Sequence, residues 1–139
     1  MAITVLSNTD FKLPIPRKAL KTWIVEVAAR YGRKVGEITY LFCDDEYLLQ
    51  VNNQYLNHDF YTDVITFDYT ESETIYGDII ISIDRIKDNA QSLNVPFEQE
   101  LRRVIIHGIL HLCGLKDKTE QEAKAMRQAE EEALAQIRF

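Results

Sequence analysis

The residues best suited to chemistry are two histidines, His107 and His111, in the stretch HGILHLCGLKDK. Positions i and i+4 of a helix project from the same face, so both imidazoles can approach one ion. Gly114 is a natural helix end, and the chain beyond it can fold back to bring Asp117 toward the pair. Two imidazoles and one carboxylate suit one divalent ion, zinc or a similar metal, and leave a position open for water.

The same pair also has a purely structural explanation. The positions between Leu101 and Leu112 are mostly apolar, so this helix is expected to be buried on most sides. A buried imidazole needs a partner, but a hydrogen bond to the backbone or to a carboxylate would serve as well as a metal. A bound metal, by contrast, could lower the pKa of its water to about 7 and polarise a phosphoryl or carbonyl oxygen. The residues alone leave both interpretations open.

Gly108 argues against a protease. In the zinc protease motif H-E-x-x-H the second position is a glutamate that acts as general base, and here that position is Gly108. A glycine allows backbone or substrate to approach a metal closely, or it allows the helix to pack tightly against a sheet.

Composition predicts a single globular domain over residues 1–139. With 46% hydrophobic residues the chain can bury one substantial core. No apolar run approaches the roughly 20 residues needed to cross a bilayer, and the first residues lack the layout of a secretory signal. We therefore expect a cytoplasmic protein without a membrane partner. Cys43 and Cys113 form no Cys-x-x-Cys pair and are expected to be reduced, buried thiols.

Charge is distributed unevenly along the chain. The net charge is -6, yet residues 1–35 hold seven bases and two acids, which give +5 and leave -11 for the rest. A basic segment on an acidic protein can mark a surface that faces phosphates, or it can be a solvated helix face. The candidate phosphate-binding bases are Arg17, Lys18, Lys21, Arg102, Arg103 and Lys116.

Hydrophobic periodicity and turn residues predict the elements that must position these side chains. Strands are expected over residues 2–8, 37–44, 63–69 and 77–84, and helices over residues 15–32, 45–56, 85–94, 96–113 and 119–139. Residues 70–76 are acidic and turn-rich and are expected to form a surface loop, and Gly36 is expected in a turn. Thr119 and Glu122 have capping-box spacing. This order indicates an α+β fold, a small mixed four-stranded sheet covered by about five helices, with the metal site on a buried helix and the following turn.

Three segments carry a resemblance to a known family. HGILHLCGLKD resembles the H-G-x-L-H-L-x-G-x-x-H signature of the YbeY family of metal-dependent endoribonucleases. TDVITFDY followed by GDIIIS resembles the family's T-D-V-L-S-F and G-D-I segments, and EAKAM resembles its pattern after the metal motif. The similarity spans about residues 35–130. The resemblance implies a mixed sheet with surrounding helices, a single zinc-like ion and cleavage of single-stranded RNA. It further implies 3′-end maturation of small-subunit ribosomal RNA and ribosome quality control, with the small ribosomal subunit as partner.

The sequence departs from the family pattern at two positions. His107 and His111 match the first two metal ligands, but Asp117 stands where the family usually has a third histidine. A carboxylate lowers the charge at the metal and should make its bound water less acidic. Leu56 stands where the family usually has an arginine that could clamp a phosphate. His58 could replace that function, or it could be an ordinary surface histidine.

Asp63 completes the candidate catalytic pair with His58. A carboxylate can orient a ligand imidazole through its second ring nitrogen, although Asp63 could equally cap the edge of a strand. Three functions therefore remain open. The first is metal-dependent cleavage of single-stranded RNA, the second is a ribosome-associated assembly factor with weak catalysis, which Leu56 would explain, and the third is hydrolysis of another substrate such as a peptide or ester.

Overall fold

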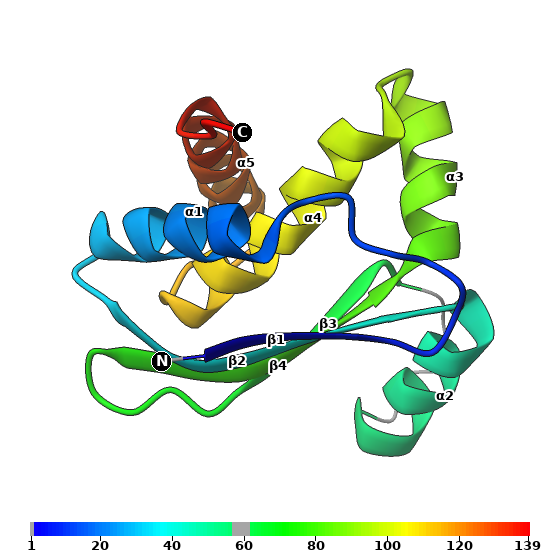
Figure 1. The fold of residues 1–139 in the computed structure, drawn as a ribbon, viewed down its shortest axis with the longest axis horizontal. Helices are drawn as coiled ribbons and strands as arrows, with labels where there is room; N and C mark the ends of the chain where they lie inside the picture. Colours follow the sequence, from blue (N-terminus) through cyan, green and yellow to red (C-terminus); the bar gives the residue numbers. More distant parts are fainter. Residues whose placement is uncertain (1, 57–61) are drawn as a thin grey trace.

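A computed structural model describes residues 2–56 and 62–139, and within that part of the chain four strands and five helices are formed (Figure 1). The strands are β1 (Ala2–Ser7), β2 (Lys34–Cys43), β3 (Val64–Asp68) and β4 (Thr74–Ser82). The helices are α1 (Arg17–Ala29), α2 (Asp45–Leu56), α3 (Ile83–Leu93), α4 (Phe97–Leu112) and α5 (Glu120–Ala135). Among the described residues, no helix has the length and apolar character that crossing a membrane requires.

The four strands form one mixed sheet in the order β1-β2-β4-β3. β2 pairs in parallel with both β1 and β4, whereas β3 pairs antiparallel to β4 and lies at the edge. Parallel neighbours need a crossover connection, and α1 supplies it between β1 and β2. The expected α+β fold with a mixed four-stranded sheet and five helices is confirmed.

One face of the sheet carries the main core. Ile75, Ile79 and Ile81 alternate along β4 and are fully buried on this face, where α1 and α4 cover the sheet (Figure 1). On the opposite face a smaller cluster of buried residues joins α2 to β3, with Leu48 and Ile65 among its members. β3, the strand at the edge of the sheet, therefore has packed residues on both of its faces. α4 contacts this strand.

Gly108 allows α4 to approach the sheet closely. A Cβ atom at this position would lie 2.7 Å from Cδ1 of Ile79, well inside normal contact distance. Polar groups also fix the helix, because the Tyr40 hydroxyl donates to the carbonyl of Ile105 at 2.9 Å. This geometry matches the helix-packing role considered for Gly108. The helix that carries the two histidines is therefore packed closely against the sheet.

Element boundaries differ from the predictions mainly around β2 and β4. Both strands begin three residues earlier than predicted, at Lys34 and Thr74, which pair with each other. Gly36 lies inside β2 instead of in a turn, where the pairing with β4 is irregular between Val35 and Ile38, and the ring of Tyr76 occupies the space that a side chain there would fill. The surface loop before β4 is correspondingly shorter than residues 70–76. The last helix ends at Ala135 and does not continue to residue 139.

Candidate metal centre

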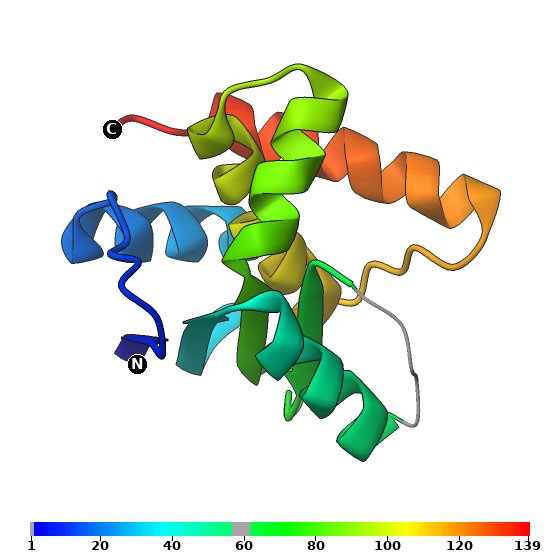
Figure 2. The same cartoon turned by 90° about the vertical axis from the view of Figure 1, so that its right-hand side faces the viewer.

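The end of α4 and the start of α5 bring Asp117 back toward the histidine helix. α4 ends at Leu112, and Gly114 follows with φ +106°, a conformation that glycine adopts readily. α5 then begins with the predicted capping box, in which Thr119 accepts from the backbone of Glu122 and the Glu122 side chain accepts from the backbone of Thr119. Figure 2 shows the connecting loop running from the end of α4 to the start of α5.

His107 and Asp117 face each other at a distance suited to a shared metal. Nε2 of His107 lies 3.4 Å from Oδ2 of Asp117. Two ligand atoms on a tetrahedral ion with bonds of about 2.0–2.1 Å would be about 3.3–3.4 Å apart. Asp117 is 45% exposed, so a metal and its water could be reached from solvent. The donor types and this separation fit a zinc-like ion.

His111 lines the same cavity as His107 and Asp117, one turn farther along α4. This cavity has a volume of about 220 Å³ and lies between α2, β3 and α4, with Asn52 and Leu56 on its other side. Across residues 2–56 and 62–139, however, no three side chains of the types His, Cys, Asp and Glu are grouped closely enough to hold a metal as they stand. Binding with all three predicted ligands therefore requires a movement of side chains or of the exposed loop at Asp117.

Glu130 of α5 is the carboxylate that contacts the His107 ring. Its Oε2 lies 2.8 Å from Nδ1 of His107, and its Oε1 lies 3.1 Å from Nη1 of Arg103. Arg103 also donates to Oε1 of Glu131 at 2.6 Å. Glu130 and Arg103 are each only 6% exposed. A buried charged network thus joins α4 to α5 directly behind the candidate metal ligand.

Asp63 lies on a second cavity that shares His107 and Asp117 with the first. This cavity measures about 320 Å³ and is lined by β3, α4 and α5, with Glu100, Arg127 and Glu130 contributing polar groups. The Asp63 carboxylate accepts from Nδ2 of Asn89 at 3.4 Å, and its backbone carbonyl accepts from the amide of Ser82 at 3.0 Å. Asp63 is therefore near the centre, while the His107 ring contacts Glu130 through Nδ1.

Electrostatics around the centre favour a positive charge. Burial alone would lower the pKa of the His107 ring, but the hydrogen bond and charge of Glu130, followed by Asp117, outweigh burial and raise that pKa. Burial raises the pKa of the Asp63 carboxyl, although the charge of His107 opposes the shift. Burial likewise raises the pKa of Glu100, and Arg103 opposes it. A divalent cation would supply the positive charge that these carboxyls lack.

The predicted RNA-binding residues are not gathered in one place. Lys116 is exposed beside Asp117, next to the candidate metal centre. Arg103 is buried in its pairs with Glu130 and Glu131, and it lines the second cavity at the metal centre. Arg102 lies over the ring of Phe139 at 5.1 Å from the ring centre, at the far end of the chain.

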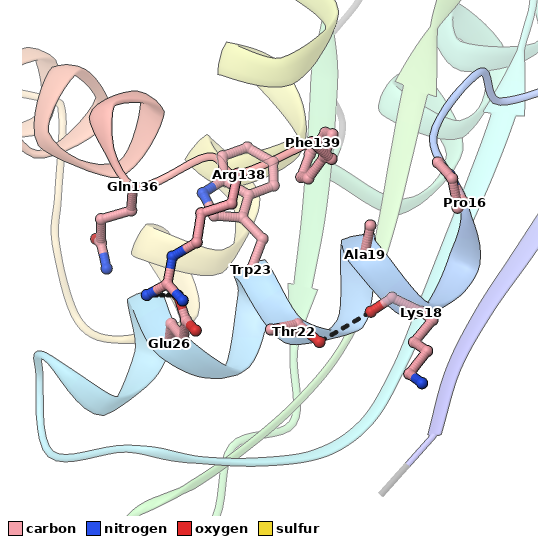
Figure 3. A pocket seen from close by; sticks show the side chains of 9 residues that line it. All are labelled: Pro16, Lys18, Ala19, Thr22, Trp23, Glu26, Gln136, Arg138 and Phe139. Carbon is pink, nitrogen blue, oxygen red and sulfur yellow. Dashed lines mark hydrogen bonds and ion pairs between the residues drawn. The ribbon is translucent and has the colours of Figure 1, made fainter.

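The bases of α1 lie by a different pocket. Lys18 lines an apolar pocket of about 370 Å³ between α1 and the chain end, together with Trp23 and Phe139 (Figure 3). Figure 3 shows the Lys18 side chain extending away from these two rings. Arg17 donates to the carbonyl of Val5 at 3.2 Å, and Lys21 is half-buried. The two cavities at the metal centre are lined by other elements.

Two further predictions concern single residues. His58, the second candidate catalytic residue, lies outside the residues that the structure describes. Both cysteines are buried free thiols, as predicted. Burial raises the pKa of Cys113 to about 11 and that of Cys43 to about 12. Neither cysteine is therefore a thiolate near neutral pH.

Glu130 is the functional candidate that sequence reasoning missed. The signal was present in α5, where Glu130 stands on the buried stripe of Met126, Ala129 and Ala133. A charged residue on an apolar helix face needs a buried partner, and Arg103 interrupts the apolar face of α4 in the same way. The two interruptions are partners of each other.

Known proteins are similar to this chain over most of its length. A family model described as endoribonuclease YbeY matches residues 5–138. An endoribonuclease YbeY of Porphyromonas gingivalis is 57% identical over 123 residues, which cover 88% of this chain and 82% of that protein. An endoribonuclease YbeY of Bacteroides fragilis is 51% identical over 136 residues, which cover 97% of each protein.

A solved structure has a fold similar to that of this chain. The solution structure of TM1509 from Thermotoga maritima is similar to this chain, with a TM-score of 0.64 and 27% sequence identity. The match covers 96% of this chain and 90% of the other. The similarity therefore extends over the sheet and its helices together.

Proposed function

The chain belongs to the endoribonuclease YbeY family and is a nuclease of ribosomal RNA processing, and on this premise we propose that it cleaves single-stranded RNA with one divalent ion, zinc, bound by His107, His111 and Asp117. We also propose a cytoplasmic location and a role in 3′-end maturation of small-subunit ribosomal RNA and ribosome quality control, with the small ribosomal subunit as partner.

The observation that supports this proposal most directly is the facing pair of His107 and Asp117. Their ligand atoms are 3.4 Å apart at the mouth of a polar cavity, which is the separation that two ligands of one tetrahedral ion require. His111 lines the adjoining wall. When bound, the ion would supply a Lewis acid for a phosphoryl oxygen and an acidified water.

The residues of the chain would hold the substrate around that ion. Lys116 and Lys118 flank Asp117 and are exposed, so their ammonium groups can pair with RNA phosphates on either side of the cut. Arg127 lines the second cavity together with Asp63 and can reach a phosphate placed there. Asp63 would accept a proton or a hydrogen bond at the reacting group, because its raised pKa makes the ionised carboxylate a stronger base than an ordinary aspartate. His58 stays a candidate for the same task.

An assembly factor with weak catalysis is the second candidate. Leu56 lines the cavity at the metal centre and is 41% exposed. It stands where the family resemblance places an arginine, and a leucine can neither clamp a phosphate nor stabilise developing charge. This position favours slow cleavage with intact RNA binding.

One experiment separates these functions. End-labelled single-stranded RNA, the same RNA in a duplex and a peptide panel would be incubated with the wild type and with His111→Ala. We expect cleavage of the single strand by the wild type, with a loss of at least about 100-fold in the variant. RNA that is retained but uncut would favour the assembly factor. Peptide turnover with inert RNA would contradict both RNA functions.

A further inference from the structure

Glu130 occupies a special position between the candidate metal ligand and a buried arginine. Its two carboxylate oxygens are divided, with Oε1 toward Nη1 of Arg103 at 3.1 Å and Oε2 toward Nδ1 of His107 at 2.8 Å. The Glu130 side chain is 7% exposed, so bulk water competes little for either contact. Each oxygen therefore has one committed partner.

The contact with Oε2 of Glu130 determines which ring nitrogen of the neutral His107 imidazole carries the hydrogen. An ionised carboxylate can only accept hydrogen bonds, so the ring nitrogen beside it must donate. With the hydrogen on Nδ1, the lone pair lies on Nε2. Nε2 is the atom that faces Oδ2 of Asp117 at 3.4 Å. The ring is thereby held in the only neutral form whose Nε2 can bind a metal.

We propose that Glu130, clamped by Arg103, is a positioning residue that sets the tautomer and the orientation of His107 for metal binding. The proposal rests on the metal site put forward above and goes beyond it, because it makes α5 a part of that site. It also gives Arg103 a task other than binding RNA. α5 packs against α4 (Figure 1), and this contact places the Glu130 carboxylate beside the His107 ring.

Glu130→Gln is the informative substitution, because a glutamine side chain has the same shape as glutamate but its two terminal groups are not equivalent. An amide has one oxygen and one NH2 group. Arg103 donates to this side chain, so the amide oxygen must face Arg103 and the NH2 group must face Nδ1 of His107. A donor there selects the tautomer with its hydrogen on Nε2, which has no lone pair for a metal. The opposite amide orientation would set two donors against each other at Arg103.

Glu131→Gln is the matched control. Glu131 also accepts from Arg103, at 2.6 Å, but its side chain is 57% exposed, and the His107 ring contacts its neighbour Glu130. A general weakening of the contact between α4 and α5 would affect both variants. Selection of a tautomer would affect Glu130→Gln alone.

The test combines nitrogen NMR with zinc affinity. Histidine tautomers are distinguished by the 15N shifts of the two ring nitrogens, measured on the metal-free chain at a pH where the ring is neutral. Zinc affinity is measured by competition with a chromophoric chelator. We expect the Nδ1–H form of His107 in the wild type and in Glu131→Gln, the Nε2–H form in Glu130→Gln, and zinc binding weaker by about 10–100-fold in that variant alone.

The outcomes separate this proposal from the function on which it rests. Zinc binding by the wild type, with the same tautomer and affinity in Glu130→Gln, would overturn the positioning role and leave the metal site intact. No zinc binding by the wild type would overturn both. If Glu130→Gln does not fold, the wild type alone still decides, because an Nε2–H form of His107 in the native chain contradicts the proposal.

Discussion

Asp117 is the residue that sets this centre apart at the scale of single side chains. A carboxylate in place of an imidazole leaves less positive charge on the metal, so the bound water loses a proton less readily. Asp117→His should therefore move the rise of RNA cleavage to lower pH, by on the order of one pH unit. The measurement is a pH–rate profile under single-turnover conditions. Identical profiles for the two proteins would exclude Asp117 from the metal.

Glu100 is a buried acid whose ionised form is poorly accommodated. It is 5% exposed, its Oε1 has no hydrogen-bond partner among the described residues, and burial raises its pKa. A raised carboxyl pKa means that the folded state holds the proton more tightly than the unfolded state. Its contribution to stability is therefore present at low pH and is lost as pH rises through the folded pKa.

Glu100→Gln should consequently stabilise the fold at pH 7, by on the order of 1 kcal/mol, and the gain should shrink as pH falls toward about 4. Urea unfolding at several pH values measures this. Glu98→Gln is the control, because Glu98 lies on the same helix and its side chain is 63% exposed. A gain that is equal at pH 4 and pH 7 would contradict the account.

Residue spacing was enough to nominate the candidate ligands but not the residues that contact them. His107, His111 and Asp117 follow from local helix geometry and a glycine stop, which are readable along the chain. Glu130 and Arg103 are paired across 27 positions, and only the crossing of two helices brings them together. Sequence shows that each is an unexpected charge on an apolar face, but it does not show which partner compensates which.

At the scale of elements, the packing of α4 on β4 is the contact that holds the centre in place. Gly108→Ala would place a methyl group 2.7 Å from Cδ1 of Ile79, and either the helix or the strand must shift. We expect a loss of about 1–3 kcal/mol in the free energy of unfolding. Thermal or urea unfolding measures it. Ile79→Val in the same chain should recover part of the loss, and full tolerance of Gly108→Ala alone would contradict tight packing.

Local sequence patterns were sufficient to predict the helices but not the residues at which β2 and β4 begin. The helices were found from their caps and apolar spacing, and the capping box at Thr119 forms as expected. The starts of β2 and β4 were missed because they depend on each other. Lys34 and Thr74 are strand residues through their mutual pairing, and Gly36 lies in β2 at an irregularity of that pairing, with the ring of Tyr76 over it. Such pairing between distant segments has no local signature.

At the scale of the whole molecule, the positions of the basic residues determine where RNA can bind. The basic segment of residues 1–35 carries +5 on a chain of net charge -6, but Lys18 lies by a pocket separate from the metal centre. Lys116 and Lys118 lie at the centre itself, beside Asp117. RNA held at both places would have to pass around α4.

Two double variants test this path. Lys116→Gln with Lys118→Gln should weaken RNA binding and also slow cleavage at saturating RNA. Lys18→Gln with Lys21→Gln should weaken binding only. In each case the slope of log affinity against log salt should fall by about 0.7 per lysine removed. A salt series with labelled single-stranded RNA measures both, and an unchanged slope would remove that pair from the RNA path.

The central claim is that His107, His111 and Asp117 hold one metal ion. The most direct test is metal content per chain by elemental analysis of gently purified protein, wild type against Asp117→Ala, with an unfolding curve for each. The account predicts close to one zinc-like ion in the wild type and clearly less in the variant, with both chains folded. A wild type that carries no metal even after reconstitution, or a variant that retains it fully, would contradict the claim.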